Sequence, residues 1–494
     1  MGFDATGMKA EITGQLARWG APSASVCVVR ENEVLFSGGI GLYDHEKREA
    51  DARTLYQIAS CTKAFTAAAA AVLATEGRLD PDAPVRHYLP SFRLWDEQAG
   101  ACLTVRDFLS HRSGLPRHEY AWYGTGFSRQ QLMENLRDLP QNAPIRYRYQ
   151  YSNFNYLIAG CLLEAVCGKE IEKILEEKLL LPLGMKRSFP YLSASRTMEN
   201  SALPFGHDEE YGMTGTRRID YYRSPAEDDA AGLGDPTAAA GCIVTCAEDM
   251  ARWLKFLIHA GRTEDGRQLI GETQWETLLE PHISLGSSGP FAPEQCMKGY
   301  ALGWEASSYR GRRLLQHGGN LNGFTTCTAF LPEEKIGVYV SVNMNVCLLA
   351  DAIALKLIDD LLGAPDAGWD ERMYAYNESL FRQVKAFYAA GTEKRADAGP
   401  VRPLADYAGD YLAPGYRRFR MEWDGSALTA DFNTFRTGLR STGENRFATL
   451  DVIGELPAGL ELTFGTDDGG NIRTLTVLLG SEKDLKPIVF TKDE

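Results

Sequence analysis

Strand-like hydrophobic runs lie near both ends of the first 365 residues, and helix-like spacing fills the chain between them. Residues 24–43 contain two β-rich runs around a short polar turn, and residues 324–343 contain two more around another turn. Each pattern is typical of a β-hairpin. Strands at both ends with helices between them predict an antiparallel sheet that is flanked by helices and carries an all-helical subdomain. We expect helices at about residues 60–76, 105–111, 153–167, 247–260 and 348–362.

Two of the predicted helices begin with a threonine that is followed three residues later by an acidic residue. The pairs are Thr104 with Asp107 and Thr245 with Glu248. At this spacing the two side chains can satisfy free N–H groups at the start of a helix. We therefore expect capping boxes, or close variants of them, at both positions.

The pattern changes after about residue 366. A charged, helix-like stretch at 369–390 leads into residues 389–403, which contain Gly, Ala and Pro. Short β-rich runs separated by turn signals follow, and they predict a small antiparallel barrel or sandwich of about 90 residues. We therefore expect an α+β chain with a first domain at 1–365, a helical linker at 366–402 and a lipocalin-like C-terminal β-barrel at 403–494.

Composition and charge argue against nucleic acid and membrane as partners. The 494 residues include 52 Lys and Arg against 66 Asp and Glu, for a formal net charge of −14, and they contain no basic stripe. The longest apolar stretch, residues 64–74, is about half the roughly 20 residues that a bilayer requires. Residues 1–21 lack the order of a secretory signal and predict an amphipathic helix. We expect a cytoplasmic protein.

The ten cysteines predict no metal site. Most lie in apolar contexts, such as Cys27 between two valines, which is typical of free thiols in a reducing compartment. Two pairs could be ligands, Cys161 with Cys167 and Cys242 with Cys246, but neither has the Cys-x-x-Cys spacing and no second pair complements them. We expect neither a metal nor a cofactor.

The first candidate for chemistry is the run from Ser60 to Lys63. It follows a β-type run and opens a predicted helix, so the lysine lies one turn after the serine on the same face. The N-terminus of a helix favours an oxyanion, and a desolvated lysine can accept or relay a proton. Chance alone would supply about one or two Ser-x-x-Lys patterns in a chain of this length. The hypothesis therefore depends on further motifs.

Two further motifs follow, at Tyr151-Ser-Asn153 and at His317-Gly318-Gly319. In this order and at these intervals, the three motifs resemble those of the serine β-lactamase and penicillin-binding protein superfamily, in its class C-like branch of esterases and D-aminopeptidases. The resemblance covers about residues 8–363 and includes the phrases at 109–115, 181–185 and 240–241.

The resemblance implies a serine hydrolase with a role for each motif residue. Ser60 is the implied nucleophile, and Lys63 with Tyr151 is the implied base pair, in which the lysine cation lowers the pKa of the phenol. Asn153 is expected to hold Lys63 and the substrate amide. The backbone N–H groups of Ser60 and Asn320 are expected to form the oxyanion hole.

One departure from the family pattern narrows the expected substrate. Lactamases and carboxypeptidases usually have a Lys or His followed by a Thr or Ser hydroxyl in the third motif, and these groups bind the free carboxylate of the substrate. This chain has His317, Gly318 and Gly319 there, which offer a largely neutral imidazole and no hydroxyl. We expect a neutral or cationic small molecule or short peptide. Esterase, amidase or D-aminopeptidase-like activity is favoured, with weak β-lactamase activity at most.

Alternatives remain for the function and for the surrounding loops. An acyltransferase or a peptide-cyclising thioesterase would keep the acyl-enzyme, and a non-catalytic binding or sensor protein would keep only the fold. Trp122, Tyr123 and Phe127 either line an acyl pocket or anchor their loop. The loops at 112–130 and 195–235 set the shape of the pocket. We expect loops of the C-terminal domain to reach over the Ser60 cleft and limit substrate size.

Overall fold

A seven-stranded antiparallel sheet forms the centre of the first part of the chain. The strand order is β2-β1-β11-β10-β9-β8-β7, so a strand from the start of the chain pairs with one that ends at residue 342. Both predicted hairpins are present, as β1–β2 and β10–β11, and the α+β fold class is confirmed. The strands are β1 Ser23–Arg30, β2 Glu33–Gly41, β7 Gln295–Tyr300, β8 Glu305–Tyr309, β9 Arg312–Leu321, β10 Phe324–Leu331 and β11 Ile336–Val342.

The computed structural model describes most of the chain. The described residues are 3–208, 213, 215–219, 235–286, 289–393, 399–450, 459–480 and 484–493. Parts of the predicted loop at 195–235 and of the linker at 366–402 therefore lie outside the described residues. Within the described ranges, no helix is both long and apolar enough to cross a membrane.

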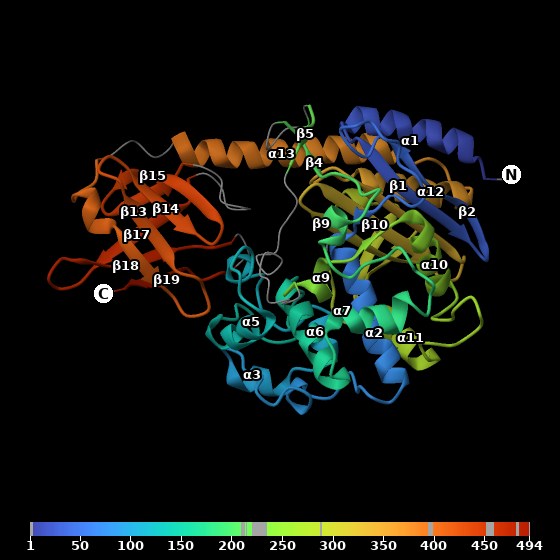
Figure 1. Ribbon diagram of the computed structural model, residues 1–494, viewed down its shortest axis with the longest axis horizontal. Coiled ribbons are helices and arrows are strands. Elements are labelled where there is room, and N and C mark those ends of the chain that lie inside the picture. The colour runs from blue at the N-terminus through green and yellow to red at the C-terminus, as the bar shows by residue number, and fades with distance from the viewer. Residues whose placement is uncertain are drawn as a thin grey trace.

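Helices cover both faces of the sheet, which is why its central strands are apolar on both sides (Figure 1). In β1, Val26 and Val28 face a core shared with α1 (Ala5–Trp19) and α12 (Leu349–Leu362). The alternate residues Cys27 and Val29 face the core on the other side, which includes α2 (Thr62–Thr75) and α10 (Ala247–Ile258). The period of two along a strand separates these two sets of side chains.

The helical subdomain lies below the sheet in Figure 1 and contains α2, α3, α5, α6 and α11. The capping box predicted at Thr104 is present with both of its hydrogen bonds. The one predicted at Thr245 is wrong, because Thr245 ends a short strand and helix α10 begins after Cys246 without a side-chain cap. The helices are α3 Glu97–Cys102, α4 Val105–Leu109, α5 Arg129–Asn135, α6 Asn153–Cys167, α7 Ile171–Leu175, α8 Ala194–Thr197, α9 Ala238–Gly241 and α11 Glu272–Leu279, and the short strands are β3 Tyr56–Gln57, β4 Phe205–Gly206, β5 Arg217–Arg218 and β6 Val244–Thr245.

The C-terminal strands form a closed eight-stranded barrel, which confirms the predicted antiparallel β-barrel. Consecutive strands pair in sequence order, and the first pairs with the last. Aromatic rings fill the interior, where Phe419 stacks on Phe432 with ring centroids 4.5 Å apart. The strands are β12 Gly409–Leu412, β13 Phe419–Trp423, β14 Leu428–Phe432, β15 Phe435–Gly443, β16 Arg446–Thr449, β17 Glu461–Thr466, β18 Ile472–Val477 and β19 Ile488–Lys492.

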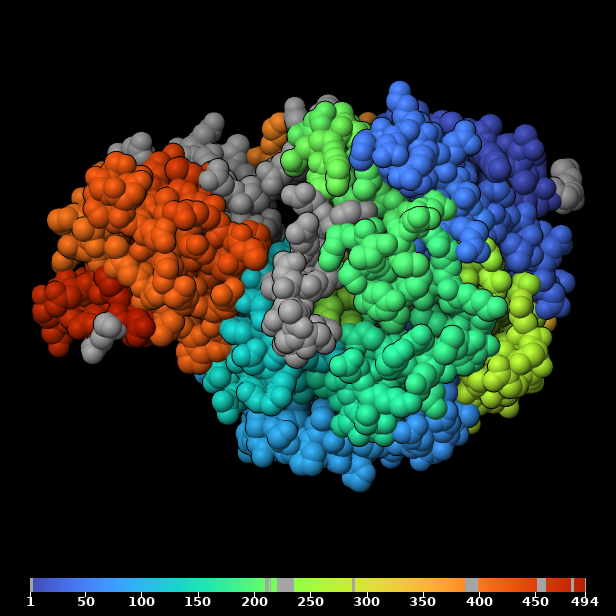
Figure 2. Space-filling model, viewed as in Figure 1, coloured from blue at the N-terminus to red at the C-terminus, as the bar shows by residue number. Residues whose placement is uncertain are grey.

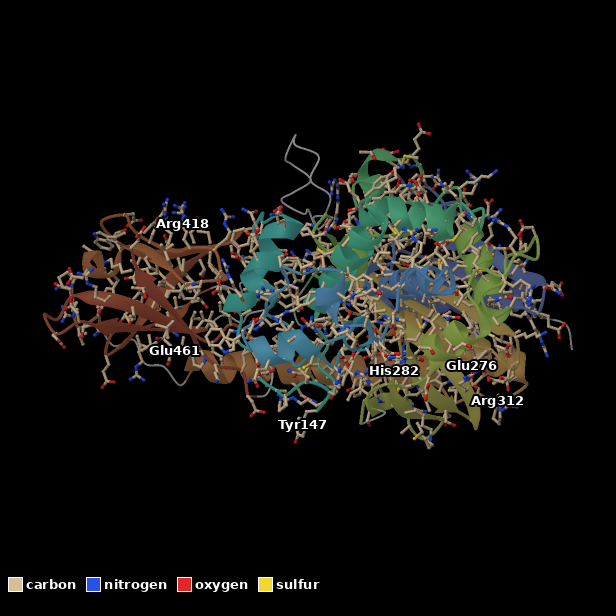
Figure 3. All side chains as sticks on the ribbon, turned by 90° about the horizontal axis from the view of Figure 1, so that it is seen from below. Tyr147, Glu276, His282, Arg312, Arg418 and Glu461 are labelled. Atoms are coloured by element: carbon tan, nitrogen blue, oxygen red, sulfur yellow. The ribbon has the colours of Figure 1, made fainter. Side chains whose placement is uncertain are left out.

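The long helix α13 (Trp369–Glu393) runs along one side of the molecule between the sheet and the barrel (Figure 1). In the space-filling view, the barrel also lies against the part of the helical subdomain around α5 (Figure 2). The view from below shows Arg418 and Glu461 on the barrel and His282 on the other part, with Tyr147 between them (Figure 3). We propose that the domain boundary lies in α13 and the residues after it.

Candidate active site

Ser60 lies in a tight 3-10 turn, Ala59–Cys61, between strand β3 and helix α2. Ala59 has a φ of +46°, a conformation that is uncommon for residues other than glycine,. Strand β9 comes very close to this turn, because a Cβ on Gly319 would lie 2.1 Å from the carbonyl oxygen of Ile58. Only a glycine fits at position 319 without moving the strand away from the serine.

The motif residues converge on the Ser60 hydroxyl. Lys63 Nζ lies 3.0 Å from Ser60 Oγ, and the Tyr151 hydroxyl donates to Ser60 Oγ at 2.7 Å. Lys63 also donates to Asn153 Oδ1 and to the carbonyl oxygen of Ala240, both at 2.9 Å. Tyr151 and Asn153 reach this point because they flank the start of helix α6, which packs in the same core as α2.

Burial sets the charge of Lys63. The side chain is fully buried, and desolvation lowers the pKa of its ammonium group to about 7,. The carboxylate of Glu119 raises this pKa, and the guanidinium of Arg117 lowers it. A large fraction of Lys63 is therefore neutral near pH 7. A neutral amine has two protons for Asn153 and Ala240 and a lone pair that can accept the Ser60 proton.

The pKa of the Tyr151 phenol is shifted in the opposite direction from the prediction. Burial raises the pKa of the Tyr151 phenol above its usual value, although the hydrogen bond to Ser60 and the charge of Arg117 oppose this shift. The predicted lowering of the phenol pKa by a Lys63 cation is therefore wrong. The cost of burying a phenolate exceeds the gain from nearby charges, so Tyr151 stays protonated and donates to Ser60.

The third motif lies in strand β9, beside the Ser60 turn. His317 is buried, its Nε2 is 2.9 Å from the Tyr300 hydroxyl and its Nδ1 is 2.6 Å from the Gly318 carbonyl oxygen. Burial, together with the charge of Lys63, lowers the pKa of His317 to about 3. The imidazole is therefore neutral at physiological pH, and hydrogen bonds occupy both of its nitrogens.

Among the described residues, no strand pairs with β9 beyond Gln316 on the side of β8. Its pairing with β8 ends at Gln316, and Cys61 Sγ donates to the His317 carbonyl oxygen at 3.1 Å. Residues 317–321 therefore face the Ser60 turn, where an oxyanion hole needs N–H donors. The side chain of Asn320 is held in place, because its Oδ1 accepts from Val346 N–H at 3.2 Å and from Thr325 Oγ1 at 3.3 Å.

Sequence reasoning missed the residues that surround these groups. Arg117 lies over the Tyr151 ring at 5.5 Å and pairs with Glu119 at 2.7 Å. His111 is fully buried with its ring centroid 4.5 Å from that of Tyr151. His111 falls within the family phrase at 109–115, which was a usable signal, whereas the pair of Arg117 and Glu119 follows no pattern in the sequence.

His111 supports the start of helix α6. Its Nδ1 accepts hydrogen bonds from Ser152 N–H at 3.3 Å and from Asn155 Nδ2 at 3.1 Å, so the ring proton is on Nε2,. Burial holds the pKa of His111 well below its usual value. A neutral His111 thus fixes the backbone between Tyr151 and Asn153.

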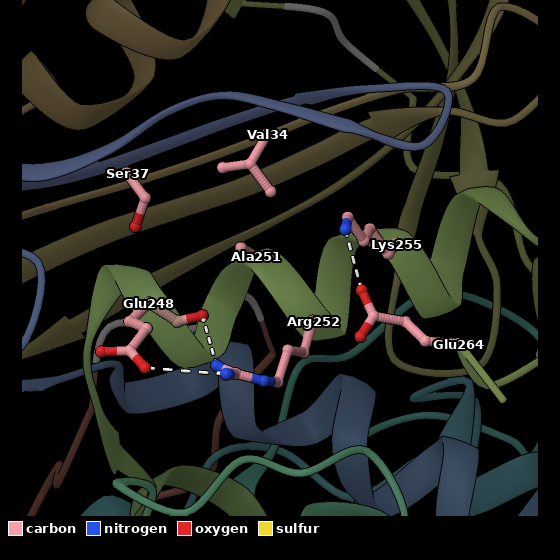
Figure 4. A pocket seen from close by; sticks show the side chains of 7 residues that line it. All are labelled: Val34, Ser37, Glu248, Ala251, Arg252, Lys255 and Glu264. Carbon is pink, nitrogen blue, oxygen red and sulfur yellow. Dashed lines mark hydrogen bonds and ion pairs between the residues drawn. The ribbon is translucent and has the colours of Figure 1, made fainter.

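A separate groove of about 210 Å³ lies between β2 and α10 (Figure 4). Its cations are already paired, Lys255 with Glu264 at 2.8 Å and Arg252 with Asp249 at 3.2 Å. The groove shares no residue with the Ser60 site. The residues that line the groove are Val34, Ser37, Glu248, Ala251, Arg252, Lys255 and Glu264.

In the described parts of the chain, no three His, Cys, Asp or Glu side chains are grouped so that they could hold a metal ion.

The chain is similar in sequence to known proteins. The β-lactamase family model matches residues 8–360. The unguisins hydrolase ungD' of Aspergillus campestris is 29% identical over 436 residues, which cover 84% of this chain and 77% of that protein.

Two solved structures share the fold. The octameric penicillin-binding protein homologue of Pyrococcus abyssi aligns with a TM-score of 0.63 at 20% identity, over 99% of this chain and 100% of its own. The D-amino acid amidase of Ochrobactrum anthropi SV3 aligns with a TM-score of 0.55 at 22% identity, over 72% of this chain and 97% of its own. The first of these alignments includes the C-terminal barrel.

Proposed function

Because the chain belongs to the β-lactamase family and is a serine hydrolase, we propose that it cleaves ester or amide bonds through an acyl-enzyme on Ser60. The observation that carries the proposal is the convergence of Lys63 and Tyr151 on Ser60 Oγ, at 3.0 and 2.7 Å. A serine with a buried, partly neutral lysine within hydrogen-bond distance has the base that its activation requires.

In the acylation step, Ser60 Oγ attacks the substrate carbonyl carbon while the lone pair of Lys63 Nζ takes the hydroxyl proton. The negative charge moves to the carbonyl oxygen, which the backbone N–H groups of Ser60 and Asn320 stabilise. One such donor is typically worth about 3 kcal/mol of barrier. The bond to the leaving group then breaks, Tyr151 gives that group a proton, and the proton held by Lys63 restores the phenol.

Water completes the reaction, with Lys63 again as the base. Lys63, neutral again, takes a proton from the water molecule that attacks the acyl carbon. The bond from Ser60 Oγ to that carbon breaks, and the proton returns to the serine. Nothing in this cycle needs a metal or a cofactor, because the lysine and the tyrosine carry every proton.

We propose a neutral or cationic substrate, such as an amino acid amide, a short peptide or an ester. The third motif supports this choice, because His317 is neutral with both nitrogens occupied and Gly318 has no hydroxyl. A free carboxylate therefore lacks the partners that lactamases supply at this position. The likeness to an unguisins hydrolase agrees with hydrolysis, and a D-amino acid amidase has the same fold.

The test is labelling with a fluorophosphonate probe, followed by mass spectrometry of the peptides. We expect the adduct on Ser60 in the wild type and in Ser37→Ala, a matched control on β2, and no adduct in Ser60→Ala. The same three proteins should be assayed against D-amino acid amides, short esters and nitrocefin. Unchanged labelling in Ser60→Ala would contradict the proposal.

A further inference from the structure

The turn between β14 and β15 of the barrel docks on residues 117–124 of the first part of the chain, which we call the clamped segment. Asn433 in this turn donates from Nδ2 to the carbonyl oxygens of Tyr120 and Tyr123, at 3.0 and 2.9 Å. The ring of Phe435 stacks on that of Tyr123, with centroids 5.9 Å apart and planes 5° apart. Two backbone carbonyls and one ring of the clamped segment are thus held by the barrel.

The fit between the turn and the clamped segment is close on both sides. Asn433 has a φ of +57°, which asparagine and glycine adopt more readily than other residues,. On the facing side, a Cβ on Gly124 would lie 2.6 Å from Thr434 Oγ1. The Tyr120 ring also packs against Phe432 and Phe435, with centroids 6.4 and 6.2 Å away. The clamped segment therefore packs closely against the residues of this turn.

A second anchor lies at the other end of the clamped segment. His118 is buried, its Nδ1 is 3.0 Å from the hydroxyl of Tyr416 in the barrel, and its Nε2 is 2.9 Å from the Pro140 carbonyl oxygen. The φ of His118 is +46°, so its backbone conformation is also unusual. The barrel thus holds the clamped segment on both sides of Glu119.

The clamped segment reaches the Ser60 site from these anchors. Next to His118, Arg117 lies 5.5 Å from the Tyr151 ring and pairs with Glu119. At the other end, the Tyr123 hydroxyl accepts a long hydrogen bond of 3.4 Å from Asn322 Nδ2. Asn322 follows Asn320 by two residues in the chain, at the end of β9 where the oxyanion hole is proposed.

We propose that the β14–β15 turn belongs to the active site as a structural part, with Asn433 as a positioning residue and Tyr123 as a residue that determines specificity. By holding Tyr123 between Phe435 and Asn322, Asn433 fixes the distance from this ring to the end of β9. That distance limits the size of the substrate group that lies beside Asn320. This inference rests on the proposed function, since it concerns the substrate of the same site.

The test compares Asn433→Gly with a matched control, Asn445→Gly. Glycine keeps the positive φ at either position and removes only the side-chain amide. Asn445 has a φ of +58° in the next barrel turn, and its Oδ1 accepts from Tyr407 inside the barrel at 2.6 Å. Both variants therefore lose side-chain hydrogen bonds made from a barrel turn, but only Asn433→Gly loses bonds to the clamped segment.

We expect Asn433→Gly to raise KM for a short substrate by about tenfold with little change in kcat, as the loss of two hydrogen bonds allows. For a bulky ester, kcat/KM should fall less or rise, because the limit on size is relaxed. Asn445→Gly should leave both KM values unchanged. An equal effect of the two variants would overturn the proposal, since it would reflect only the stability of the barrel.

Amide hydrogen exchange in residues 118–125 provides a readout that needs no turnover. We expect faster exchange there in Asn433→Gly than in the wild type or in Asn445→Gly. Unchanged exchange together with an unchanged KM would overturn the role of Asn433. Failure of the wild type to cleave any substrate would instead overturn the proposed function, and the exchange rates would still decide whether Asn433 holds the clamped segment.

Discussion

At the scale of single residues, the charge of Lys63 decides whether Ser60 can be activated. The Ser-x-x-Lys spacing predicts that serine and lysine lie on one face of a helix, and the structure brings them within 3.0 Å. The pKa of about 7 could not be predicted in this way. It depends on burial beneath residues that are far away in the sequence, such as Tyr156, whose ring lies 5.4 Å from Lys63 Nζ.

The pH dependence of activity should respond in opposite directions to the two charges beside Lys63. Arg117 lowers the pKa of Lys63 and Glu119 raises it. Only neutral Lys63 accepts a proton, so activity is lost as pH falls through this pKa. Arg117→Gln should therefore move the acidic limb of the kcat/KM profile to higher pH, and Glu119→Gln should move it to lower pH, each by about one unit or less.

The measurement is the profile of kcat/KM against pH for an uncharged ester, whose own ionisation does not contribute. The double variant serves as the control, and its acidic limb should lie between those of the single variants. Shifts of both single variants in the same direction would contradict the assignment of Lys63 as the base.

At the scale of elements, the close approach of strand β9 to the Ser60 turn positions the third motif. A sequence pattern identifies His317-Gly318-Gly319, but it does not reveal why the second glycine is required. In the structure the reason is the carbonyl oxygen of Ile58, which would lie 2.1 Å from a Cβ on Gly319. At Gly318 the nearest atom would be the Thr326 carbonyl oxygen at 3.9 Å, which is an ordinary contact distance.

Gly319→Ala should therefore reduce activity far more than Gly318→Ala does. The new methyl group pushes β9 away from the Ser60 turn, and a displacement of about 1 Å in an active site can cost about a hundredfold in rate. Measuring kcat and Tm for both variants separates loss of geometry from loss of stability. Equal kcat values in the two variants would show that the close approach at Gly319 has no catalytic consequence.

Sequence patterns predicted correctly those elements that depend on residues close together in the chain. The two hairpins and the capping box at Thr104 are present, because alternation and cap spacing act within a few residues. Thr245 has the same spacing and does not cap. Its Oγ1 instead lies 2.6 Å from Ser188 Oγ, and its backbone pairs in a short strand. Partners distant in the sequence override the local signal there.

At the scale of the whole molecule, the sequence predicts a C-terminal β-barrel but not the strand pair that closes it. Short strands with turn signals suit a sandwich as well as a barrel. The pairing that distinguishes them joins β12 to β19, at opposite ends of the C-terminal region. The contacts of the clamped segment also could not be predicted from local patterns, because its partners Asn433 and Tyr416 lie about 300 residues further along the chain.

The aromatic interior should carry much of the stability of the barrel. Phe419 is fully buried between Phe432 and Phe490, so Phe419→Ala should destabilise the barrel by about 3–5 kcal/mol through the cavity that it leaves,. Calorimetry should show this as a lower unfolding temperature. Val489→Ala, at a position that is 54% exposed on β19, is the control and should change little. Similar losses in both variants would argue against a packed interior.

The pairing of β1 with β11 also affects how the chain folds during synthesis. Arg30 at the end of β1 lies opposite Ile336, so the first hairpin leaves the ribosome about 300 residues before its neighbour exists. At about 5–20 residues per second, the interval is about 15 to 60 seconds. During that time β1, whose residues 23–29 are all buried in the folded protein, has an uncovered edge. The nascent hairpin is then exposed to pairing with other chains, which is a risk that chaperones limit.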